Sequence, residues 1–126
     1  MTTQTTATDE RAVLVVDDDS AVLNSLRFSL GIEGFDVRVF QSDQDLLTAN
    51  ALPERACLVV DYNLPHGNGL DLVAALRARG QHFPAILITS DPSTNVRRRA
   101  AAAGVVIIEK PLLTDALIES INRALS

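Results

Sequence analysis

The chain has 126 residues, a length that fits one compact domain and leaves no room for a second. Apolar residues make up 47% and charged residues 21%, which indicates a globular protein and excludes a disordered one. The formal net charge of −5 argues against nucleic-acid binding, because contacts to phosphates need a basic face.

Residues 1–10 are polar and rich in threonine, which predicts a flexible leader before a domain over residues 11–126. This start lacks the apolar core of a signal peptide, and no apolar stretch approaches the ~20 residues of a membrane span. The single cysteine, Cys57, lies in an apolar run and is typical of a core residue in a reducing compartment. We therefore expect a cytoplasmic protein without membrane contact.

The first predicted strand covers residues 12–16, and the helix after it begins at the capping residue Ser20. Gly31 and Gly34 loosen and end that helix. A second strand over residues 36–40 alternates apolar and polar residues, which suits the edge of a sheet.

A short helix comes next, because Ser42 and Asp45 have the spacing of a capping box, and it ends before Pro53. The continuous apolar run 56–60 predicts a third strand. A loop rich in proline and glycine then leads into a helix whose apolar positions are Leu70, Leu72, Val73 and Leu76.

The fourth strand is expected over residues 85–88, and the helix after it is capped by Ser93 and closed by Gly104. The fifth strand covers residues 105–108, and Thr114 caps the last helix. Such alternation predicts a single doubly wound α/β domain, with a parallel five-stranded sheet covered by helices on both faces. With the second strand at an edge, the expected strand order is 2-1-3-4-5.

Polar residues stand where each buried strand ends: Asp17, Asp18 and Asp19, then Asp61, then Thr89, then Lys110 after Glu109. In a parallel sheet these ends share one edge, which is the edge where open α/β sheets bind ligands. Neighbouring strands are ~4.8 Å apart, so the first and third strands bring carboxylates within reach of one cation.

Carboxylates gathered at one spot repel each other and need a counter-charge, of which Lys110 supplies one. A site made of oxygen ligands favours a hard cation, Mg²⁺ or alternatively Mn²⁺. The Thr89 hydroxyl and the Lys110 ammonium are the donors that a phosphoryl group needs. The pattern therefore predicts phosphoryl transfer to or from a carboxylate.

From Arg11 to Ser126 the chain resembles the receiver domains of two-component response regulators, which implies a (βα)₅ flavodoxin-like fold. The matching stretches are Val15 to Asp19, Asp61 to Pro65 with Gly69 and Leu70, Thr89 with Ser90, and Lys110 with Pro111. The resemblance implies that Asp61 accepts a phosphoryl group from a phosphohistidine. It also implies that Thr89 and Lys110 bind that group.

The same resemblance implies a Mg²⁺ site. Asp18 would ligate the ion directly, Asp17 mostly through water, and Asp61 and the main-chain carbonyl of Asn63 would complete the protein ligands. For Asp19 we expect a different task, the capping of the helix that follows.

The sequence departs from the family pattern at Ile107, where the family usually carries Tyr or Phe as a rotating switch coupled to the threonine. Residues 100–103 are all alanine, so the fourth helix has few large anchors and is a plausible moving part. Residues 97–99 form a basic turn on that helix, which we interpret as a solvated face, with contact to an acidic partner as the alternative.

We expect a phosphorylation switch rather than an enzyme, because such a protein promotes only its own phosphorylation and dephosphorylation. A sensor histidine kinase or phosphotransfer protein would phosphorylate Asp61 and shift the surface of the fourth helix and fifth strand. That shift would control a partner or output domain, in a monomer or a phosphorylation-dependent dimer.

Two alternatives remain open. The first is a phosphate-independent interaction module with the same fold, which Ile107 favours. The second is a haloacid-dehalogenase-type phosphohydrolase, whose Asp-x-Asp spacing Asp17 and Asp19 share, although the further acidic pair after the lysine is missing. The sequence also leaves open whether the chain stands alone or belongs to a longer regulator.

Overall fold

The computed structural model describes residues 11–126, so the predicted leader over residues 1–10 lies outside the described part. Its strands are β1 (Ala12–Val16), β2 (Asp36–Phe40), β3 (Cys57–Asp61), β4 (Asn63–Leu64), β5 (Gly67–Asn68), β6 (Ala85–Thr89) and β7 (Val106–Glu109). Its helices are α2 (Ser20–Ile32), α3 (Asp43–Leu47), α4 (Gly69–Ala78), α5 (Thr94–Ala103) and α6 (Thr114–Leu125). None of these helices has the length and apolar character that crossing a membrane requires.

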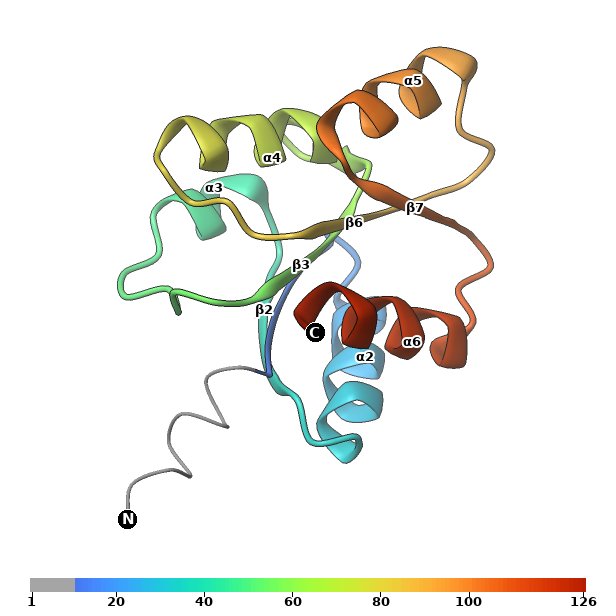
Figure 1. Cartoon of the computed structure of the whole chain (residues 1–126). Coiled ribbons are helices and arrows are strands. Elements are labelled where there is room, and N and C mark those ends of the chain that lie inside the picture. The colour runs from blue at the N-terminus through green and yellow to red at the C-terminus, as the bar shows by residue number, and fades with distance from the viewer. Residues whose placement is uncertain (1–10) are drawn as a thin grey trace.

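Five strands form one parallel sheet in the order β2-β1-β3-β6-β7, which is the predicted order 2-1-3-4-5. Helices α2 and α6 cover one face of the sheet, and α3, α4 and α5 cover the other (Figure 1). The predicted doubly wound α/β architecture is therefore confirmed, with β2 and β7 at the edges.

The core consists of two clusters, one on each face of the sheet, because successive residues of a strand point to opposite sides. In β1, Leu14 and Val16 face α3, α4 and α5, whereas Val13 and Val15 face α2 and α6. All five residues of β1, β3 and β6 are buried, as expected for strands covered on both faces. Cys57 is a buried free thiol in this core, as predicted.

Three strands end one residue later than predicted: β3 and β7 are displaced by one residue, and β6 is one residue longer. The reason is that the polar residues still pair with their neighbours, Asp61 with Ile88 and Thr89 with Glu109. The candidate site residues Asp61 and Thr89 are thus the last residues of strands, and the sheet itself fixes their backbones.

Two predicted caps are wrong. Asp19, not Ser20, caps α2: its backbone is extended and its carboxylate accepts hydrogen bonds from the amides of Ala21 and Val22. Ser20 and Thr114 are instead the first residues of their helices, and α6 has no side-chain cap.

The other predicted caps are confirmed, since Ser42 accepts from the Asp45 amide at 3.0 Å and Ser93 from the Val96 amide at 3.1 Å. Gly104 closes α5 in the left-handed conformation, with φ of 70°. Gly31, by contrast, lies inside α2, which ends at Ile32.

Candidate functional site

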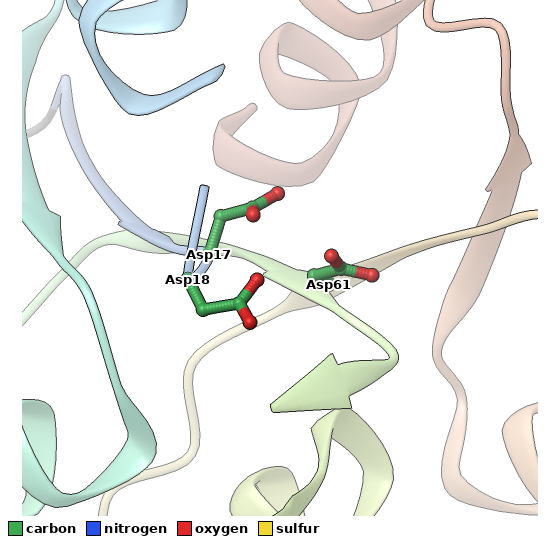
Figure 2. A group of neighbouring side chains, drawn as sticks. All are labelled: Asp17, Asp18 and Asp61. Atoms are coloured by element: carbon green, nitrogen blue, oxygen red, sulfur yellow. The ribbon is translucent and has the colours of Figure 1, made fainter. Parts of the chain in front are cut away.

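Three carboxylates meet at the C-terminal edge of the sheet. Asp17 and Asp18 follow β1, and Asp61 ends the neighbouring β3. One oxygen from each of them lies within 4.8 Å of the others, and Figure 2 shows the three side chains gathered around one space. Asp17 and Asp61 are buried, whereas Asp18 is exposed.

Burial raises the pKa of Asp17 from 3.8 to about 6, because the charged form loses its hydration there. The Asp19 amide, which donates to the Asp17 carboxylate at 2.9 Å, lowers that pKa in part. The negative charge of Asp61 raises it again, and the positive charge of Lys110 lowers it. A site in which a buried carboxyl resists ionisation is short of positive charge.

The donor set fits the predicted cation. Three carboxylates within reach of one another are the oxygen ligands that Mg²⁺ takes, and neither histidine nor cysteine belongs to the group. Adding a cation would remove the shortage of positive charge around Asp17. Asp17, Asp18 and Asp61 are therefore close enough together to share one cation, and their role as metal ligands stays a prediction.

The basic and hydroxyl residues of the site lie on the opposite side of Asp61. The Lys110 ammonium is 3.4 Å from the Asp61 carboxylate. Thr89 is buried at the end of β6, and the Lys110 amide donates to the Thr89 carbonyl at 2.9 Å. The peptide bond between Lys110 and Pro111 is cis. The two residues predicted to bind a phosphoryl group thus lie on one side of Asp61, and the acidic cluster lies on the other.

Asn63 lies in a short antiparallel hairpin, β4–β5, in a segment for which the sequence predicts only a loop. Its amide donates to the Asp61 carboxylate at 3.3 Å, and its pairing with Asn68 fixes the backbone that would offer a carbonyl ligand. Strands of two residues are too short to show a periodic pattern, so this hairpin could not be predicted from the sequence.

The start of α4 touches the backbone of β3 and of the residue that follows it. The Gly69 amide donates to the Tyr62 carbonyl at 2.8 Å. A Cβ at Gly69 would lie 2.7 Å from both the Asp61 carbonyl oxygen and the Leu87 side chain, so no side chain fits there. The glycine allows α4 to begin directly against β3.

Beside the acidic cluster lies a cavity of about 330 Å³ between α2 and the segment after β7. Asp17, Asp61 and Lys110 line its polar side, and its remaining wall is mainly apolar, with Leu26 and Leu112 among its residues. The cavity gives the site an opening to the surface.

Ile107, at the position of the family's aromatic switch, pairs with Leu87 in the neighbouring strand and packs half-buried on the face covered by α5. Two of the arginines on α5 form ion pairs: Arg97 with Glu109 at 2.8 Å and Arg99 with Asp71 at 3.0 Å. The basic turn is thus an exposed helix face, although part of it is engaged in contacts within the chain.

Comparisons with known proteins agree on one family. Residues 13–122 match the family described as the response regulator receiver domain. The chain is 32% identical over 115 residues to the transcriptional regulatory protein TdiR of Thauera aromatica, which covers 90% of the chain and 51% of TdiR. It is 34% identical over 114 residues to FixJ of Azorhizobium caulinodans, which covers 90% of the chain and 54% of FixJ.

Among solved structures, a receiver domain protein of Methanospirillum hungatei superposes with a TM-score of 0.79 at 28% identity, which covers 91% of this chain and 93% of that one. The chain spans about half the length of the curated relatives it matches. The fold, the order of the site residues along the chain and these matches lead to one conclusion. The chain belongs to the response regulator receiver domain family of two-component signal transduction.

Proposed function

We propose that residues 11–126 form a receiver whose Asp61 accepts a phosphoryl group from a phosphohistidine of a sensor histidine kinase or phosphotransfer protein. The observation that carries the proposal is the position of Asp61. Its carboxylate lies within 4.8 Å of two other carboxylates and 3.4 Å from the Lys110 ammonium. An acceptor needs that arrangement, because the incoming phosphoryl group must be met by positive charge on more than one side: a cation held by the carboxylates would supply it on one side, and Lys110 on the other.

In the transfer, a carboxylate oxygen of Asp61 forms a bond to phosphorus while the bond from phosphorus to the donor imidazole breaks. The imidazole nitrogen keeps the electron pair of that bond. Mg²⁺ held by Asp17, Asp18, Asp61 and the Asn63 carbonyl would neutralise the charge that gathers on the phosphoryl oxygens. Lys110 and the Thr89 hydroxyl would bind those oxygens from the other side.

The signal would pass through Thr89 and Lys110 because both are joined to the edge of the sheet. The Lys110 amide is hydrogen bonded to Thr89, and Lys110 directly follows β7. A phosphoryl group that draws these two side chains in would therefore shift β7 and the adjacent α5. That surface would control a downstream partner or an output domain, and hydrolysis of the acyl phosphate would reset it.

The proposal extends to the setting of the protein. The receiver would act in the cytoplasm, where kinases can reach it, as a monomer or as a dimer formed on phosphorylation. Its chemistry would be confined to its own phosphorylation and dephosphorylation, without turnover of a separate substrate. The curated relatives of which it spans about half are transcriptional regulators, so control of a transcriptional output is one use of such a domain.

A direct test is labelling with acetyl phosphate and Mg²⁺, followed by intact mass. We expect the wild-type chain to gain one phosphoryl group and Asp61→Asn to gain none. Asp71→Asn is the matched control, because Asp71 is an exposed aspartate outside the acidic cluster and should leave labelling unchanged. Full labelling of Asp61→Asn would refute the assignment.

One alternative has an observation in its favour. Ile107 stands where the family's aromatic switch would be, so the domain could serve as a phosphate-independent interaction module. Mg²⁺ with beryllofluoride, a mimic of the phosphoryl group, separates the two cases. Changed NMR positions for Thr89 and β7 support the phosphorylation switch, and an unchanged spectrum favours the module.

A further inference from the structure

Positive charge is concentrated on two neighbouring helices of an acidic chain. Residues 69–79 and 94–103, which make up α4 with its C-cap residue and α5, contain five arginines and one aspartate. These helices therefore carry a charge of +4 in a chain whose net charge is −5. The phosphorylation site described above does not use any of these arginines.

A groove of about 650 Å³ runs between the same two helices. Leu70, Val73, Ala74 and Ala102 supply apolar surface, and Arg77 and Arg99 line the groove as well. Figure 1 shows α4 and α5 as neighbours on one face of the sheet. Small alanine side chains at facing positions keep the two helices from filling the space between them.

We propose that this groove docks an acidic, amphipathic helical segment of a partner protein. The apolar surface would receive the apolar face of such a segment, and the arginines would meet its carboxylates. Each wall helix has ten residues, a length of ~15 Å, so the groove matches about three turns of a docked helix.

The contacts that the arginines already make can give way to a partner. Arg99 on α5 pairs with Asp71 on α4 at 3.0 Å, and the side chains are 42% and 61% exposed. Exposed pairs of this kind contribute little to stability, so a carboxylate of the partner can replace Asp71. Arg98 is exposed and forms no ion pair with any residue between 11 and 126, which leaves one further cation beside the groove.

A nucleic acid fits the surface less well than an acidic peptide. A phosphate backbone gains from cations along its path but nothing from the apolar wall that Leu70, Val73 and Ala74 supply. The net charge of −5 also repels a long polyanion. A short segment with a few carboxylates and an apolar face uses both parts of the groove.

The test uses the full, unphosphorylated chain without Mg²⁺, labelled with ¹⁵N. The probe is a synthetic helical peptide of roughly 14 residues, built from leucine on one face and glutamate on the other. We expect NMR shifts confined to α4 and α5, and weaker binding of the same peptide with glutamine in place of glutamate. Because this experiment needs no phosphate, it can fail or succeed independently of the phosphorylation switch.

Matched variants locate the contact. Ala102→Glu places a carboxylate in the groove and should weaken binding at least about tenfold, whereas Ala101→Glu, exposed on the same helix outside the groove, should change it less than about threefold. Arg99→Gln should weaken binding, and Arg27→Gln on α2 should not. Equal effects within either pair overturn the proposal, as do shifts outside the groove or no binding at all. Binding of a DNA duplex at α4 and α5 in preference to the peptide overturns it too.

Discussion

Helices α2 and α5 lie on opposite faces of the same sheet, but they are held to it by different amounts of buried side chain. Helix α2 has 13 residues and buries Leu23, Leu26 and Leu30. Helix α5 has 10 residues and buries only Val96 and Ala100. The first helix begins beside the acidic residues of the site, and the second packs near β7 on the side of Lys110.

Under the proposed function, this difference would separate two tasks in one small domain. The residues that gather charge are fixed by buried strands and by a helix with three leucine anchors. Helix α5, which would respond to phosphorylation, is held to the sheet by one valine and one alanine. Because opening free energy follows buried apolar contact, α5 can move at a lower cost than α2.

The largest expected difference between α2 and α5 concerns the side chains that they bury in the core. Leu30 is fully buried under α2, so Leu30→Ala should lower the free energy of unfolding by about 2–5 kcal/mol. Val96→Ala under α5 removes fewer contacts and should cost about 1–2 kcal/mol. Denaturant titration measures both values. Equal losses would show that α5 is anchored as firmly as α2.

The effect of the Asp17 charge, which lies near the start of α2, on the stability of the fold can be tested through pH. The pKa of Asp17 is raised from 3.8 to about 6 in the folded state, so its charge destabilises the fold fully above pH 6 and not at all below 3.8. Without Mg²⁺, Asp17→Asn should therefore stabilise the domain by about 1–3 kcal/mol at pH 7.5, an effect that fades as pH falls through this window.

Mg²⁺ supplies the control for that measurement. The ion should stabilise the wild-type chain more than Asp17→Asn, and its affinity should fall below pH 6, where the Asp17 carboxyl is protonated. Thermal melts at several pH values, with and without the ion, follow both effects. A variant that is less stable than the wild type at pH 7.5 without Mg²⁺ would contradict the reasoning.

Hydrogen exchange compares the two helices directly. We expect the backbone amides of α5 to exchange at least about tenfold faster than those of α2 in the same sample. The helices serve as each other's control, because solvent, temperature and global stability are shared. Equal protection in both would remove the basis for a mobile α5.

The smallest expected effect concerns the helix caps, which should be equal in the two regions. Asp19→Ala and Ser93→Ala should each cost about 1 kcal/mol without Mg²⁺, because each side chain accepts a hydrogen bond from the first turn. Ser20→Ala is the matched control and should cost less than about 0.5 kcal/mol. A greater loss for Ser20→Ala than for Asp19→Ala would restore Ser20 as the cap.

The sheet was predictable because its evidence is spread over whole strands. Continuous apolar runs such as 12–16 indicated buried strands, and the alternation of 36–40 indicated an edge. The grouping of Asp17, Asp18 and Asp61 followed from strand ends that share one edge of a parallel sheet.

What the sequence left undetermined depends on single residues. Asp19 and Ser20 are both good caps, and the choice between them depends on where extended backbone turns into helix. Likewise Leu113 precedes α6 without a capping side chain, although Thr114 follows directly. Such one-residue choices are decided by packing of the whole chain, which leaves no local pattern.

Gly69 places a constraint on the groove between α4 and α5. A side chain at this position would collide with the Asp61 backbone, so the glycine lets α4 begin in direct contact with β3. Helix α4 thus begins against the backbone of Asp61, whereas α5 is held to the sheet by Val96 and Ala100. If both proposals hold, phosphorylation of Asp61 would change the distance between α4 and α5, and a partner docked between them would respond to that distance.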